Sequence, residues 1–198
     1  MHPYATDSGE RIRVTAILVV ISLLAGSFTD RIGALPTWTD FIVDVSAAGW
    51  FVILFWLADN FFWRFGIFHW PWLFQVPNLA GKWTGELHTS WDDFKVPLEC
   101  RLEVKQTWTR MSVKFETKRD GKISSTSVSK ASSLLLDQDG ETVLRYEYQN
   151  TPDPTQIEKL DIHWGTTKIE VCDDNGSTRL EGSYYTNRKP PTRGKFTL

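Results

Sequence analysis

The sequence predicts a membrane anchor of two apolar helices followed by a small all-β domain. Two observations support this fold class. The first 74 residues hold two long apolar runs, and from about residue 79 onward hydrophobic residues alternate with polar ones. Composition changes at the same place, because residues 1–74 contain no lysine and only four arginines, whereas the remainder carries 18 basic and 18 acidic residues. Such a change marks regions that face different solvents, so we predict an anchor over 1–74 and a β domain over 75–198.

The first apolar run is Ile12–Phe28, with one charge, Arg13, close to its start. At ~1.5 Å rise per residue, a helix of this length spans roughly 25 Å, enough for a thin bilayer. The second run, Phe41–Trp63, is longer and includes Asp44 and Asp59. Because both runs are apolar all round, we predict two transmembrane helices, with a soluble helical hairpin and a cleaved signal peptide as alternatives.

Basic residues beside the runs predict the orientation of the anchor. Arg11 and Arg13 precede the first run and Arg64 follows the second, whereas the connecting loop holds only Arg31. Since basic flanks stay on the cytoplasmic side, both ends of the chain are predicted to be cytoplasmic. The aromatic segment 61–74 suits the headgroup layer, where its rings would contact membrane lipid.

Asp44 and Asp59 stand out because ionisable side chains are costly inside a bilayer. They are 15 residues apart, so ~1500° of helical rotation leaves them about 60° apart on one helix face. One interpretation is a polar stripe that lines an assembly of helices. The other is that both carboxylates lie near the two interfaces and are hydrated.

After residue 79 the sequence predicts about eight short antiparallel strands, each with one buried and one wet face. Alternation is clearest over Leu98–Lys105, Met111–Glu116 and Leu144–Gln149. The other predicted strands are Gly81–Trp91, Ile123–Ser132, Lys168–Cys172, Leu180–Thr186 and Gly194–Leu198. Asp-Gly or Asn-Gly pairs at 120–121, 139–140 and 175–176 are typical of hairpin turns. Closure into a lipocalin-like, up-and-down, eight-stranded barrel removes the sheet edges and leaves room for one small ligand; a β-sandwich is the alternative.

The ends of the predicted strands carry polar and aromatic side chains. This mixture is typical of a ligand site, in which aromatic faces stack on rings and arginine contacts phosphate oxygens in a forked geometry. Such side chains include Trp91, Tyr146, His163 and Tyr184, together with the candidate ligand-binding residues Thr107, Trp108, Arg110, Tyr148, Asn150, Thr186 and Arg188.

Motifs for catalysis or metal binding are missing from the sequence. It has no GxGxxG, P-loop or GxSxG motif, and His88 and His163 have no partner at metal-ligand spacing. Alternation points Cys100 into the barrel, which favours a packed thiol over a nucleophile. The formal net charge of −2 argues against DNA or RNA as a partner. We therefore expect a protein that is not an enzyme and needs neither metal nor cofactor.

A series of short motifs resembles one known family. Pro77–Gly85 (PNLAGKWTG) opens the β domain and Gln106-Thr107-Trp108 ends its second strand. Tyr146–Asn150 (YEYQN), His163–Thr166 (HWGT) and Leu180–Arg188 (LEGSYYTNR) follow in that order. After two apolar runs, this order resembles the CBASS antiphage effectors that combine two transmembrane helices with a C-terminal β-strand-rich domain.

The resemblance implies a bacterial inner-membrane effector whose cytoplasmic barrel binds a cyclic dinucleotide made by a partner nucleotidyltransferase. It implies that binding drives homo-oligomer formation and that the assembled helices disrupt the membrane, which kills the infected cell. The ligand contacts that it implies are Thr107, Trp108, Tyr148, Asn150, Thr186 and Arg188. The residues alone leave two other functions open, a membrane-anchored lipocalin-like carrier of an apolar ligand and a non-catalytic membrane scaffold.

Overall fold

The computed structural model of the protein describes residues 1–33, 46–65, 73–119, 121–136, 141–152, 162–174 and 177–198. The chain forms two compact units. The helical unit comprises Ser8–Val76, and the barrel unit comprises Met1–Asp7 together with Pro77–Leu198. The barrel unit is therefore built from two separate stretches of sequence.

The helical unit contains α1 (Glu10–Gly33), α2 (Ala47–Asn60) and a single 3-10 turn, η1 (Phe62–Arg64). Ser46 caps α2, because its side-chain oxygen accepts a hydrogen bond from the backbone nitrogen of Gly49 at 3.3 Å. The two helices approach closely where Gly26 meets Ala47. A Cβ atom at Gly26 would lie only 3.0 Å from the Cα of Ala47, so a small residue is required there.

The outer surface of the helical unit is apolar, with Ile12, Leu24 and Val52 all about two-thirds exposed or more. Among the described residues, one helix, over Glu10–Thr29, is long and apolar enough to cross a membrane. The predicted first span is thereby supported, whereas α2 has 14 residues, which is short of the ~20 that a span needs. The predicted second span begins outside the described residues.

The predicted polar stripe has one described member. Asp44 lies outside the described residues, and Asp59 is half-buried near the end of α2. The stripe therefore stays a prediction.

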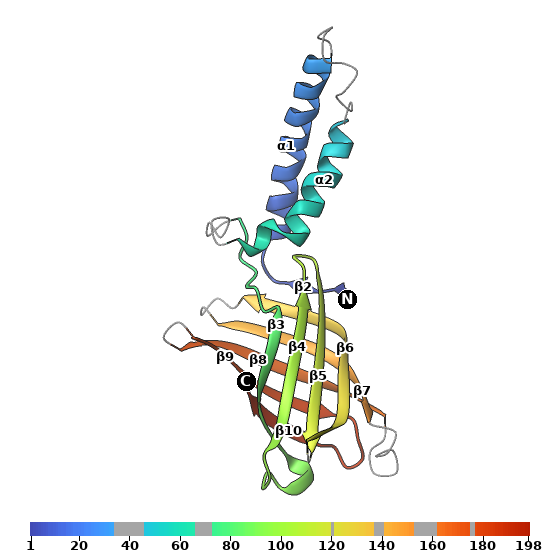
Figure 1. Cartoon of the computed structure of the whole chain (residues 1–198), viewed down its shortest axis with the longest axis vertical. Coiled ribbons are helices and arrows are strands. Elements are labelled where there is room, and N and C mark those ends of the chain that lie inside the picture. Colours follow the sequence, from blue (N-terminus) through green and yellow to red (C-terminus); the bar gives the residue numbers. More distant parts are fainter. Residues whose placement is uncertain (34–45, 66–72, 120, 137–140, 153–161, 175–176) are drawn as a thin grey trace. The chain divides into compact units, whose positions relative to one another are not determined.

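Eight strands close into an up-and-down antiparallel barrel (Figure 1). Each strand pairs with the next one along the chain, and the last, β10, pairs with the first, β3. This closure confirms the predicted closed antiparallel barrel and excludes the sandwich alternative. The strands are β3 (Gly81–Thr89), β4 (Leu98–Gln106), β5 (Arg110–Arg119), β6 (Lys122–Leu136), β7 (Thr142–Pro152), β8 (His163–Asp174), β9 (Ser177–Thr186) and β10 (Arg193–Thr197).

Two further short strands precede the helical unit, β1 (His2–Pro3) and β2 (Ala5–Thr6). β1 pairs antiparallel with β5 and β2 pairs in parallel with β6. They belong to the same sheet as the barrel strands, although the alternation pattern of the sequence did not predict them.

Inward-facing glycines make room for large aromatic rings inside the barrel. In each of three cross-strand pairs the ring lies over a glycine on the neighbouring strand, an arrangement that fills the space left by the missing side chain. A Cβ atom at Gly182, for example, would lie 2.1 Å from the Phe196 ring. The pairs are Tyr148 with Gly165, Phe196 with Gly182 and Tyr184 with Gly194.

We predict that Gly182→Ala destabilises the barrel by about 1–3 kcal/mol, because the added methyl group forces the Phe196 ring out of its position. Thermal unfolding of the purified full chain, followed by tryptophan fluorescence, measures the effect. The matched control is Ser183→Ala on the outer face of the same strand, which should stay within about 0.5 kcal/mol of the wild type. Equal stability of the two variants would contradict the packing argument.

Candidate ligand-binding cavity

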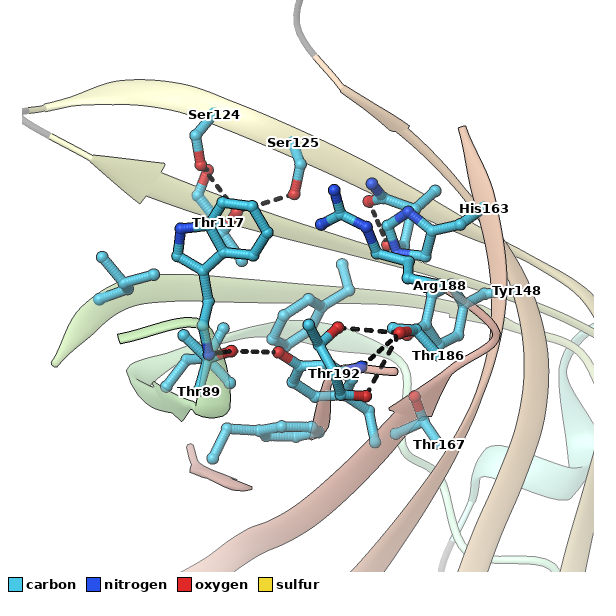
Figure 2. Close-up of a pocket in the computed structure, with 18 of the residues that line it drawn as sticks. Thr89, Thr117, Ser124, Ser125, Tyr148, His163, Thr167, Thr186, Arg188 and Thr192 are labelled. Atoms are coloured by element: carbon cyan, nitrogen blue, oxygen red, sulfur yellow. Dashed lines mark hydrogen bonds between the residues drawn. The ribbon is translucent and has the colours of Figure 1, made fainter. Parts of the chain in front are cut away.

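A cavity of about 160 Å³ lies inside one end of the barrel. Its mouth is formed where β3 leads into β4, β5 into β6, β7 into β8 and β9 into β10. Figure 2 shows the labelled side chains converging on this space from strands all around the barrel. The cavity therefore exists only in the closed barrel, because strands from all around the barrel contribute its wall.

The deeper part of the cavity is aromatic and aliphatic. The Phe115 and Phe196 rings pack with centroids 4.9 Å apart, and the Tyr146 and Tyr148 rings with centroids 6.1 Å apart. Burial raises the pKa of both tyrosines above its ordinary value, so each keeps its hydroxyl hydrogen at neutral pH. Flat apolar rings with neutral hydroxyl groups can stack on a heterocyclic ring and donate hydrogen bonds to it.

The part nearer the mouth is lined by short hydroxyl side chains that are tied to one another. The Thr117 hydroxyl oxygen lies 2.9 Å from those of both Ser124 and Ser125, and Figure 2 shows this cluster. On the other side of the mouth, Thr186 and Thr192 join their hydroxyl groups at 2.8 Å. These bonds hold the rim in place and leave the space between its sides open.

Asn150 contributes a buried side-chain amide to the wall, at 5 % exposure. Its side-chain oxygen already accepts a hydrogen bond from the Ser127 hydroxyl at 2.8 Å. Its amide nitrogen can in addition donate to a carbonyl oxygen or a ring nitrogen of a ligand.

The basic side chains among the described lining residues all lie at the mouth of the cavity. Arg119 ends β5, Arg188 lies between β9 and β10, and His163 begins β8. The Arg188 guanidinium lies 4.9 Å from the centre of the Trp91 ring, a cation–π contact that restrains the long side chain. Of the lining residues that the structure describes, none carries a carboxylate, so the mouth favours an anionic ligand.

The structure brings four of the predicted ligand residues together and leaves three elsewhere. Tyr148, Asn150, Thr186 and Arg188 all line the cavity. In contrast, the structure places Thr107, Trp108 and Arg110 where β4 leads into β5, at the other end of the strands. There Trp108 is fully buried, and Thr107 accepts a hydrogen bond from the backbone nitrogen of Arg110 at 3.1 Å. These three residues belong to a turn that does not line the cavity.

Several lining residues were missing from the predicted site. Arg119 is one of three charged residues among the last four of β5, with Glu116 and Lys118, so its sequence context does not single it out. Ser125 and Ser127 of β6 could have been found, because they and Ser129 recur every second residue where a filled core would need aliphatic side chains. The other lining residues absent from the predicted site are Thr89, Trp91, Thr117, Ser124, Tyr146, His163, Thr167, Tyr184 and Thr192, together with Leu87, Leu98, Phe115 and Phe196.

The sequence profile of one protein family, described as Cap15, cyclic dinucleotide receptor domain, matches residues 74–198. This stretch is more than half of the chain and contains all eight barrel strands. The chain belongs to this family. The resemblance to CBASS effectors is thereby confirmed, and a cyclic dinucleotide is the ligand class that the Cap15-type domain indicates. Comparisons with curated proteins and with solved structures gave no match to the chain.

The Cap15-type domain has two thiols with different surroundings. Cys100 is fully buried on β4, where burial raises the pKa of its thiol to about 12, with a smaller contribution from Glu86 and Glu99. Cys172 on β8 is half-exposed. Among the described residues, no group of three or more His, Cys, Asp or Glu side chains is placed to hold a metal ion.

We predict that iodoacetamide at pH 8 modifies Cys172 and leaves Cys100 unmodified in the folded chain. The thiolate is the nucleophile, and with a pKa of about 12 only ~10⁻⁴ of the Cys100 thiol is ionised at this pH. Both cysteines should react in urea. Mass spectrometry of the alkylated peptides measures the difference, and rapid modification of Cys100 in the folded chain would contradict the burial argument.

Proposed function

We propose that the chain is a CBASS effector that binds a cyclic dinucleotide at the mouth of its barrel, self-associates, and disrupts the inner membrane of the infected cell. The observation that carries the binding proposal is the cavity itself. It combines aromatic walls and an arginine on each side of the mouth with a lining in which no described residue is acidic. A ligand with flat rings and negative charge fits this combination best.

The two arginines have a spacing around the barrel that suits two phosphates. Arg119 ends β5, whereas Arg188 follows β9, and in the closed order of eight strands β5 and β9 lie across from one another. A cyclic dinucleotide carries its two phosphates on opposite sides of its ring. Each phosphate can therefore contact one arginine in a charge-assisted hydrogen bond, while the bases point toward the interior.

The size of the cavity supports this arrangement. At about 160 Å³ it is smaller than the ~300–1,000 Å³ typical of sites that enclose a whole small molecule. We infer that one base enters between the Tyr148 and Tyr184 rings and that the phosphates stay at the mouth. In this respect the barrel would hold its ligand less deeply than the lipocalin-like barrel predicted from the sequence.

The membrane part of the proposal rests on the exposed apolar surface of the helical unit. Side chains such as Ile12 and Leu24 would each gain about 1.5–3 kcal/mol on leaving water. We propose two spans, with both chain ends in the cytoplasm, because the basic residues flank the predicted spans on their outer sides. The barrel would then meet a cyclic dinucleotide made in the cytoplasm by a partner nucleotidyltransferase.

Self-association follows from linkage between binding and assembly. A ligand shifts an equilibrium only through its different affinity for the two states, so we propose that the occupied barrel favours the assembled form. Confinement to a membrane raises the effective concentration of the helices and makes weak contacts between them sufficient. In this scheme the chain acts as a receptor without catalysis or a metal cofactor.

Two features argue against the alternative functions. A carrier of an apolar ligand needs an apolar mouth, whereas this mouth is lined by hydroxyl groups, two arginines and a histidine. A scaffold needs only a filled barrel, whereas the short serines of β6 leave space inside this one.

We predict that Arg188→Ala weakens cyclic dinucleotide binding by about 10–100-fold, since a charge-assisted hydrogen bond contributes about 1.5–3 kcal/mol. Calorimetric titration of the purified full chain with cyclic di-GMP, cyclic di-AMP and cyclic GMP–AMP measures the affinity. The control is Arg193→Ala in the same hairpin, whose exposed side chain lies outside the cavity lining and whose loss should leave affinity within about two-fold. Equal affinities in the two variants would show that Arg188 does not contact the ligand. A rise in the thermal unfolding temperature with fatty acids but with no cyclic dinucleotide would favour the carrier function.

We predict that a membrane-impermeant maleimide labels Cys172 only after the inner membrane has been permeabilised. Cys172 is the half-exposed cysteine of the barrel, so it reports which side of the membrane the barrel occupies. Spheroplasts that express the chain are labelled before and after lysis, with Cys172→Ser as the control for background. Labelling of Cys172 in intact spheroplasts would overturn the proposed cytoplasmic location.

A further inference from the structure

The barrel wall has a seam between β5 and β6. These strands pair only where Lys114–Arg119 meets Lys122–Val128. β6 then bulges between Ser129 and Ala131 and continues to Leu136 along β7. The first residues of β5 and the last residues of β6 are therefore not paired with each other, and the edges of both strands face a gap.

The segment Met1–Asp7, here called the strap, fills this seam. His2 lies opposite Met111 of β5 in antiparallel register, and Ala5 lies opposite Ser133 of β6 in parallel register. Unpaired backbone groups at a strand edge are costly when buried and prone to pairing with other chains when exposed. The strap provides partners for both edges and completes the wall.

Side chains of the strap strengthen this attachment. Tyr4 is only 3 % exposed and its hydroxyl donates a hydrogen bond to the Trp108 carbonyl oxygen at 2.8 Å. The Asp7 carboxylate accepts a hydrogen bond from the backbone nitrogen of Leu136 at 2.9 Å. The strap is therefore bound to β6 at one end and to the β4–β5 connection in its middle.

His2 and Ser129 close the point where β6 leaves β5. The Ser129 hydroxyl oxygen accepts a hydrogen bond from the backbone nitrogen of Val113 at 2.9 Å and lies 2.8 Å from His2 Nε2. His2 Nδ1 lies 3.0 Å from the carbonyl oxygen of Pro3. Because a carbonyl can only accept, Nδ1 carries the hydrogen in this contact. One serine thus joins β5, β6 and the strap.

Both chain connections of the helical unit start from the same corner of the barrel. Gln106, 2 % exposed at the end of β4, donates from its amide nitrogen to the Pro77 carbonyl oxygen at 3.0 Å. Its amide oxygen accepts from the backbone nitrogen of Leu79 at 2.9 Å. The strap binds the adjacent Trp108 and β5. Both segments of the barrel unit that continue into the helical unit are therefore bound beside the connection between β4 and β5.

We propose that the strap couples the cavity to helix α1. The β5–β6 pair carries both features, since Thr117, Ser125 and Ser127 line the cavity while Val113 and Ser129 hold the strap. A ligand that changes the separation of β5 and β6 at the mouth changes the attachment of the strap, and α1 begins three residues after Asp7. This inference rests on the proposed ligand function for its trigger, and it requires only different ligand affinities for two strap arrangements.

Hydrogen–deuterium exchange of the full chain in detergent micelles tests the coupling. The reporters are the amide of Leu136, which Asp7 holds, and the peptide that covers the strap and the first turn of α1. In the wild type, saturating cyclic dinucleotide should change exchange at both reporters by about five-fold or more. Tyr4→Ala should speed exchange at Leu136 about ten-fold without ligand.

Measuring ligand affinity distinguishes an effect on the strap from an effect on the cavity. Tyr4→Ala should bind cyclic dinucleotide within about two-fold of the wild type, because Tyr4 is absent from the cavity lining, while α1 loses its response. Tyr185→Ala, at an exposed tyrosine of β9, is the matched control and should keep both the ligand affinity and the response of α1. In a Cys172→Ser background, a disulfide between Ala5→Cys and Ser133→Cys locks the strap. The locked chain should bind ligand without a change at α1, and reduction should restore the change.

Each of the other outcomes overturns either the attachment of the strap, the coupling to α1 or the receptor function. Wild-type exchange at Leu136 in Tyr4→Ala would show that the strap is not held by the contacts described. Ligand binding to the wild type with unchanged exchange at both reporters would overturn the coupling and leave the proposed receptor function intact. Failure of every cyclic dinucleotide to bind the wild type would overturn the receptor function and the coupling with it, whereas attachment of the strap would still be judged from exchange at Leu136.

Discussion

Closure of eight strands into a barrel is the constraint on which the other features depend. A barrel of this size has an interior just wide enough for its own side chains, so a cavity exists only where the inward residues are short. Here aromatic rings laid over glycines, such as Phe196 over Gly182, take up part of the interior, whereas short serine and threonine side chains leave space along the rest of the lining. The position of the cavity is thus decided by side-chain volume along β5, β6 and β9.

The same constraint explains how a chain with a net charge of −2 can recognise an anion. A large basic surface is unnecessary when a few cationic groups surround a narrow opening whose described lining contains no carboxylate. Contact with Trp91 restrains Arg188 before any ligand arrives, so less side-chain entropy is lost on binding. A restrained Arg188 side chain and a small number of basic groups at the mouth together favour a compact, doubly charged ligand over a polyanion.

Alternation in the sequence predicted all eight barrel strands and their antiparallel order, because a period of two requires one buried face. It did not decide which strand ends meet. In an up-and-down barrel, successive connections lie at opposite ends, so Tyr148–Asn150 and Thr186–Arg188 share one end while Thr107–Arg110 lies at the other. Counting strands would have separated them. Arg119 and the segment Met1–Asp7 could not be found in this way, because one is an ordinary strand-end charge and the other carries too few residues to show a period.

The division of the barrel between two stretches of sequence has a practical consequence. The helical unit is an insertion within the domain, placed between β2 and β3. A soluble fragment that starts after the helices would therefore lack part of its own wall and would expose two strand edges at the seam. Such edges recruit other strands, so oligomers formed by a fragment of this kind would report the missing piece instead of the native assembly.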